Sequence, residues 1–147
     1  MATQTRSIDI DAPVETVFDI ALDIGRLWRM KDLALSEIDI NPDGVGTSAR
    51  IFTHVLGFHL EGVVEYTEVV PFKRIVAQVR FFAEKPTWTF TFKRAKGGTK
   101  VTAVGEWNVS LPVVGRPIEG MMVKEHEPFV ELLLTNLKTA AEVHEAA

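Results

Sequence analysis

Polar and apolar residues alternate in several short stretches of this chain, and each stretch predicts a β-strand with one buried face. The segment TWTFTFK at residues 87–93 shows this most clearly, because Trp88, Phe90 and Phe92 share one face and threonines share the other. Residues 5–11 follow the same period. Each aromatic ring can bury about 150–250 Å² of surface. We therefore expect the aromatic face of this strand to lie against a large apolar partner.

Similar patterns, together with turn residues, predict five further strands. A turn at Leu56-Gly57 would set His54 opposite His59 and Ile51 opposite Gly62. In this register the charged residues and histidines share one face of the hairpin, and the apolar residues share the other. We expect the first face to contact solvent and the second to point inward. In chain order, the five strands are expected at residues 36–40, on both sides of residues 56–57, at 73–82 and at 99–108.

Three segments have the period of helices instead. After Pro13, which suits a first helical position, an apolar stripe runs from Val14 to Leu22. A second short helical turn is expected to follow and to include Trp28. The pattern is helical again from Ile118 to the end of the chain, and Pro128 should kink or split this helix because it removes a backbone hydrogen bond.

This order of elements predicts one α+β domain over residues 1–147: a seven-stranded curved antiparallel sheet wrapped around a long C-terminal helix, with two short helices after the first strand. Antiparallel sheets bury one face, and a twisted sheet that grips one helix leaves a gap where the two diverge. We expect this gap to be an apolar pocket. The small residues that share a strand face with Trp107 should leave room in it.

Composition narrows the possible partners. The chain has 147 residues, of which 46% are hydrophobic and 24% charged, and its formal net charge is -4. Such a charge provides no positive field for a phosphate backbone, so we do not expect nucleic acid as a partner. There are no cysteines, and no apolar run approaches the roughly 20 residues needed to cross a bilayer. We expect a cytoplasmic protein without an integral membrane segment, as a monomer or homodimer.

Three segments carry a resemblance to a known family: IDIDAPVETVFDIALDIGRLWRM near the start, VVEYTEVVPFKRI in the middle and GGTKVTAVGEW in the last strand. Together they resemble the START-related polyketide cyclase and lipid-transfer superfamily (SRPBCC) over nearly the whole chain. The resemblance implies a helix-grip fold with a hydrophobic cavity. Members of this superfamily bind lipids, sterols or polyketides, or act as cyclases, so the resemblance assigns no catalytic residue here.

Candidate ligand-binding residues are those expected on the inner face of the sheet and on the C-terminal helix, and ordinary core packing is the alternative for each. Among them, Tyr66 carries a hydroxyl that needs a partner if it is buried, and a ligand oxygen could supply one. The candidates are Tyr66, Trp88, Phe90, Trp107, Met121, Met122, Glu125 and Phe129.

Three of the polar residues are candidates for catalysis. Glu125 has helical spacing toward the cavity, and a buried carboxylate must be paired or protonated; a raised pKa would suit it as a general acid or base. Tyr66 could also transfer a proton. Arg80 could clamp a carboxylate or enolate if a bulge turned it inward, although surface exposure is the expected alternative.

Metal and cofactor sites are not expected. His54 and His59 face each other across a turn, but a zinc site needs three or four ligands. The glycines lack the spacing of a phosphate-binding loop.

Three functions remain open. The chain could bind a small hydrophobic molecule that is polyketide-, aromatic- or lipid-like. It could act as a cyclase, dehydratase or aromatase in the same cavity, or it could be an interaction module with a filled core.

Overall fold

The computed structural model describes residues 2–28, 33–55, 58–81, 85–107 and 130–144. Within these ranges the chain forms two short helices and seven strands, followed by a helix over residues 130–144. In chain order the labelled elements are β1 (Ala2–Ile10), α1 (Val14–Leu22), α2 (Ile24–Leu27), β2 (Ala34–Asp39), β3 (Ser48–Val55), β4 (Phe58–Val70), β5 (Arg74–Arg80), β6 (Thr87–Ala95) and β7 (Gly98–Trp107).

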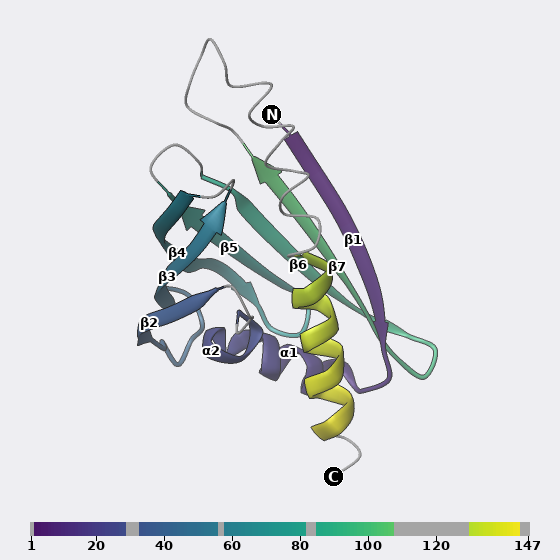
Figure 1. Ribbon diagram of the computed structural model, residues 1–147. Helices are drawn as coiled ribbons and strands as arrows, with labels where there is room; N and C mark the ends of the chain where they lie inside the picture. The colour runs from purple at the N-terminus through teal and green to yellow at the C-terminus, as the bar shows by residue number, and fades with distance from the viewer. Residues whose placement is uncertain (1, 29–32, 56–57, 82–84, 108–129, 145–147) are drawn as a thin grey trace.

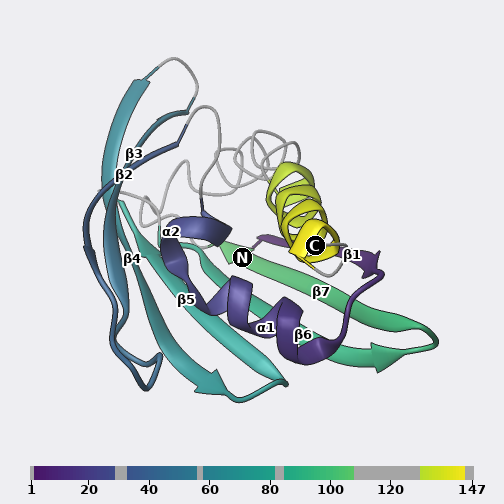
Figure 2. The ribbon, with the colours of Figure 1, turned by 90° about the horizontal axis from the view of Figure 1, so that it is seen from below.

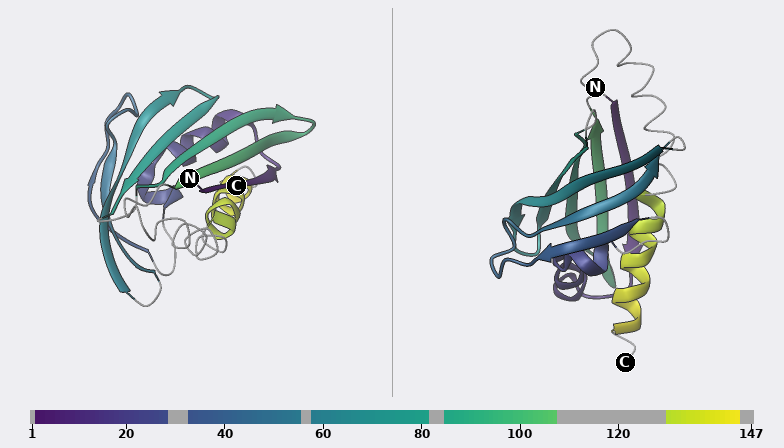
Figure 3. Two further views of the ribbon diagram at one scale, coloured as in Figure 1. Left: turned by 90° about the horizontal axis from the view of Figure 1, so that it is seen from above. Right: turned by 60° about the vertical axis from the view of Figure 1, so that its left-hand side comes forward.

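The strands form one antiparallel sheet with the order β1-β7-β6-β5-β4-β3-β2. The chain from β2 to β7 is a simple meander, and β1 pairs with β7 at the far edge. Figures 1 and 2 show that the sheet curves strongly and that α1, α2 and the C-terminal helix all lie on its concave side. Figure 3 shows the same arrangement from above. The predicted helix-grip architecture is confirmed.

The C-terminal helix presents an apolar stripe to the concave side. Its buried residues recur at steps of three and four, as in the inward face of an amphipathic helix; they are Val130, Leu133, Leu134, Leu137 and Ala141. No helix in the described part of the chain is both long and apolar enough to span a bilayer.

Polar contacts fasten this helix to the end of β1 and to the loop that follows it. Glu142 accepts a hydrogen bond from the backbone N–H of Asp11 at 2.8 Å and pairs with Lys138 at 2.6 Å. Lys138 also donates to the backbone carbonyl of Asp9 at 3.0 Å. These interactions lower the pKa of Glu142, first through the Lys138 hydrogen bond and then through the Asp11 N–H. The end of the helix is therefore held by charge-assisted hydrogen bonds in addition to its apolar stripe.

The hairpin register predicted around Leu56-Gly57 is confirmed, since His54 pairs with His59 and Ile51 with Gly62. The predicted faces are also found, because Ile51 is buried whereas Glu61 is exposed.

Several element starts differ from prediction by one to three residues, among them those of β1, β2 and α1. Strand β1 begins at Ala2 rather than Thr5, because pairing with β7 continues to Trp107. Pro13 precedes α1 in an extended conformation (ψ 151°), so the predicted first helical position was wrong by one residue. Its carbonyl still accepts the first helical hydrogen bond, from Val17 at 3.1 Å.

Candidate functional site

The inner face of β6 divides into two parts according to what covers it. Phe92 packs edge-on against Phe18 of α1, with ring centroids 5.3 Å apart, and belongs to the core beneath that helix. Phe90 meets Trp28, at the end of α2, at 6.4 Å. Trp88, further along the strand, packs against Trp107 of β7 at 5.2 Å in a T-shaped pair. The two tryptophans thus form an aromatic surface beyond the rings that α1 and α2 cover.

This surface lies where β7 ends and β1 begins. In Figure 1 that end of the sheet is at the top, whereas α1 and α2 lie across the bottom. Trp88 and Trp107 are both fully buried, and Phe90 stacks beside Trp88 with centroids 6.4 Å apart. We call Trp88, Phe90 and Trp107 the aromatic cluster; Trp28 covers its Phe90 end, and Trp88 and Trp107 extend beyond that contact. All three were predicted as ligand-binding residues, and the fold brings them together.

The expectation that small residues beside Trp107 leave open space was wrong for Gly105. A Cβ atom at this position would lie 2.6 Å from the Trp88 ring, so the indole already occupies the volume above the glycine. Gly105 pairs with Trp88 across the β6–β7 ladder, which places the ring directly against it. The missing side chain therefore accommodates Trp88, and any ligand must lie on the far side of that ring.

Tyr66 has a protein partner where the sequence suggested a ligand. Its hydroxyl donates a 2.7 Å hydrogen bond to the backbone carbonyl of Ala21 in α1, and the side chain is fully buried. Burial raises the pKa of the Tyr66 hydroxyl well above its ordinary value, and the nearby Asp23 charge acts in the same direction. The hydroxyl thus stays protonated and fastens α1 to β4, which is unlike the polar ligand contact expected for it.

Arg80 lies on the outer face of the sheet, so the inward orientation considered for it is not found. Its guanidinium pairs with Glu65 at 3.4 Å, and 47% of its side chain is exposed. Two further arginines, one on β3 and one on β5, pair with glutamates of β4 on the same face: Arg50 with Glu61, and Arg74 with Glu68 at 2.6 Å. Arg80 therefore belongs to a row of surface ion pairs.

The remaining predicted residues, Met121, Met122, Glu125 and Phe129, lie outside the described residues, as does the kink expected at Pro128. Their place in the site stays a prediction.

Among the described residues, no group of three or more histidine, cysteine, aspartate or glutamate side chains could hold a metal ion.

One buried polar residue near the aromatic cluster was missed. Gln4 in β1 is only 5% exposed, and it pairs with Gly105 of β7. The predicted strand began at Thr5 and so left it out. Counting back by twos from the inward residues Ile10 and Ile8 reaches Gln4, so the alternation itself could have found it.

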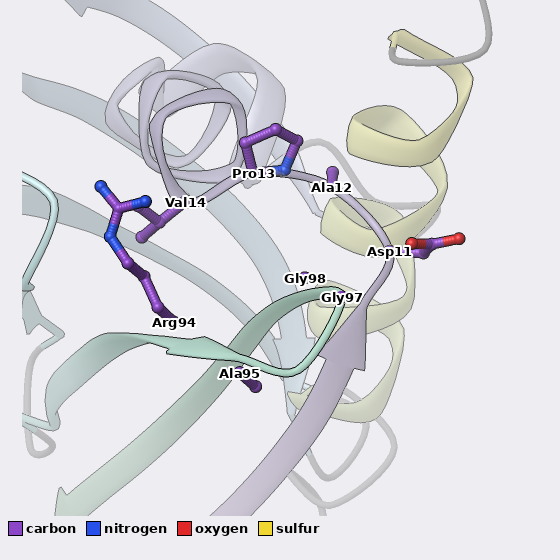
Figure 4. Close-up of a pocket in the computed structure, with 8 residues that line it drawn as sticks. All are labelled: Asp11, Ala12, Pro13, Val14, Arg94, Ala95, Gly97 and Gly98. Carbon is purple, nitrogen blue, oxygen red and sulfur yellow. The ribbon is translucent and has the colours of Figure 1, made fainter.

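A separate hollow of about 420 Å³ lies at the opposite end of the sheet (Figure 4). It is lined by residues 11–14, which lead from β1 into α1, and by the end of β6 and the β6–β7 turn, including Arg94 and Gly97. Arg94 pairs with Glu15 at 2.5 Å. None of the predicted ligand-binding residues lines this hollow, so the aromatic cluster remains the candidate site.

In a comparison with known protein families, residues 1–142 match the family described as "Polyketide cyclase / dehydrase and lipid transport". Among the curated proteins, none matches.

Several solved structures share the fold at low sequence identity. The protein TTHA0849 from Thermus thermophilus is 19% identical, with a TM-score of 0.76 and coverage of 97% of this chain and 99% of its own. A START superfamily protein from Mycobacterium smegmatis is 15% identical, with a TM-score of 0.69 and coverage of 95% and 97%. Ara h 8.0201 is 13% identical, with a TM-score of 0.71 and coverage of 97% and 98%. These likenesses agree with the topology in Figure 1, and the family match extends over almost the whole sequence. This chain therefore belongs to the polyketide cyclase / dehydrase and lipid transport family.

Proposed function

We propose that this protein binds a small hydrophobic molecule, aromatic, polyketide-like or lipid-like, on the concave side of its sheet and against the aromatic cluster. The observation that carries the proposal is the position of Trp88 and Trp107, which form a T-shaped pair on the inner face beyond the rings covered by α1 and α2. Ligand pockets are mostly apolar and rich in aromatic side chains. Membership of a family described by lipid transport and polyketide cyclisation supports the same proposal.

The structure describes two of the catalytic candidates, Tyr66 and Arg80, and the partners of both favour binding over catalysis. The Tyr66 hydroxyl stays protonated and donates a hydrogen bond to a backbone carbonyl, and Arg80 is ion-paired on the outer face. A general acid or base must reach the proton that it transfers, and neither residue is so placed. The cyclase or dehydratase alternative therefore depends on Glu125, and Glu125→Gln would test it by abolishing turnover without loss of ligand affinity.

The proposal is tested by titrating the native protein with the fluorescent dye ANS and then displacing the dye with 2-methoxynaphthalene or decanoate. We expect saturable binding at about one site per chain, with energy transfer from tryptophan to the dye. Trp107→Leu should weaken dye binding, whereas Phe52→Leu should not, because Phe52 is 39% exposed on the outer face. Near-UV circular dichroism must stay native throughout, since partly unfolded states also bind ANS.

Dye binding that no compound displaces would contradict the proposal. Equal affinity in wild type and Trp107→Leu would also contradict it.

A further inference from the structure

Apart from tyrosine and tryptophan, the described residues include three buried polar side chains, and two of them have clear partners. Thr99 donates a 2.8 Å hydrogen bond to the carbonyl of Ala12, and Thr47 accepts one from the backbone N–H of Asn41 at 3.0 Å. Gln4 is the exception, because its side-chain oxygen Oε1 is buried and accepts no hydrogen bond. A buried carbonyl without a partner destabilises the folded state, so such groups call for a specific explanation.

The sheet register places this amide beside the aromatic cluster. Gln4 pairs with Gly105 of β7, and Gly105 pairs with Trp88 of β6, so the three residues form one row across the inner face. Gly105 has no side chain, and the Trp88 indole occupies the space above it. Strand spacing puts the Cα atoms of Gln4 and Trp88 about 10 Å apart, and the indole extends from Trp88 over Gly105 toward Gln4. The row thus places the aromatic ring of Trp88 next to the residue that carries the unsatisfied acceptor.

We infer that Gln4 anchors the polar end of the bound molecule, and that this ligand carries a hydrogen-bond donor, a phenolic or alcoholic hydroxyl, on an aromatic or polycyclic body. The inference rests on the proposed function and deepens it. A carbonyl oxygen only accepts hydrogen bonds, so the ligand group that meets it must donate. A purely hydrocarbon ligand would leave the acceptor unpaired, and an ionised carboxylate has no proton to offer. The site should therefore bind a hydroxylated compound more tightly than an analogue without the hydroxyl group. Only the hydroxylated compound gives the buried oxygen a hydrogen-bond partner.

The test compares two probes of nearly equal shape, 2-naphthol and 2-methoxynaphthalene, by displacement of ANS near neutral pH. The first can donate a hydrogen bond and the second cannot. We expect the wild-type protein to bind 2-naphthol about five- to tenfold more tightly, the ratio that one additional buried hydrogen bond provides. In Gln4→Leu this ratio should fall to about one, through weaker binding of 2-naphthol and unchanged binding of the ether. Gln4→Met, which keeps the unbranched shape, should behave in the same way.

The control is Thr5→Leu, one residue along the same strand but exposed on the opposite face, and it should keep the wild-type ratio. Thermal unfolding of each variant provides a second readout. If Gln4 serves recognition, Gln4→Leu unfolds at the wild-type temperature or above, because an unpaired polar group has been removed from the interior. If Gln4 instead holds a structural water, Gln4→Leu unfolds at a lower temperature and keeps the probe ratio, which would overturn the inference.

A wild-type ratio near one, or an unchanged ratio in Gln4→Leu, would also overturn the inference and leave the proposed function standing. Failure of both probes to bind would instead reject the proposed function for aromatic ligands, and the anchor with it.

Discussion

Gly105→Ala is expected to destabilise the protein through a single steric contact. The added Cβ would lie 2.6, 2.7 and 2.8 Å from three carbons of the Trp88 indole. Carbon atoms pack comfortably at about 3.5 Å, so the ring would have to move by about 1 Å. It is fully buried and packed on Trp107, and a rigid indole cannot bend away as a flexible chain could.

The magnitude follows from two opposing terms. Overpacking a close-packed core costs about 1–3 kcal/mol. Replacing a glycine inside a strand by alanine recovers about 0.5–1 kcal/mol of conformational entropy. We therefore expect Gly105→Ala to lower the free energy of unfolding by about 1 kcal/mol, the difference between the middle values of these two terms. In a Trp88→Leu background the three ring atoms are absent, so only the entropic gain remains and the alanine becomes neutral or stabilising.

The assay is a double-mutant cycle, with urea unfolding followed by far-UV circular dichroism. The coupling energy between positions 105 and 88 should be about 1–3 kcal/mol, equal to the steric term. Gly97→Ala is the control: its backbone has φ +80° and nothing lies within 4 Å of the added atom. It should cost about 1 kcal/mol in both backgrounds, because the cost is conformational. Additivity of Gly105→Ala and Trp88→Leu within about 0.5 kcal/mol would refute the steric account.

Two further predictions concern how the helices are attached to the sheet. Tyr66→Phe should lower the free energy of unfolding by about 1–2 kcal/mol, because it leaves the buried Ala21 carbonyl without its 2.7 Å partner; a cost below that of the exposed substitution Thr67→Val, measured in the same urea assay, would contradict this role. The pKa of Glu142 is lowered in the folded state, so its contribution to stability is present above the unfolded pKa and is lost as the pH falls through the carboxylate range. Melting temperatures measured from about pH 3 to about pH 7 should fall more steeply with acid in wild type than in Glu142→Gln, and parallel curves would rule this linkage out.

The residue pattern alone determined the strands, their faces and the fold class. In β6 the alternation of Trp88, Phe90 and Phe92 with threonines fixes which face is buried, because successive side chains on a strand point to opposite sides. The register around Leu56-Gly57 was also predictable, since a two-residue turn leaves only one pairing for the strands that it joins. Such features depend on neighbours in the chain, and a one-residue error would expose every apolar side chain of the strand.

Only the tertiary structure shows which of the buried residues already have a partner within the protein. The Tyr66 hydroxyl meets the Ala21 carbonyl 45 positions away, and the Trp88 ring fills the space that Gly105 leaves in the next strand. The Gln4 amide becomes a candidate anchor only because β1 joins the sheet beside β7 and brings it into the row with Gly105. Periodicity predicts that a side chain points inward, but the groups that it contacts in the interior come from segments distant in sequence. Close packing of those segments decides whether the inward group is satisfied, crowded or left for a ligand.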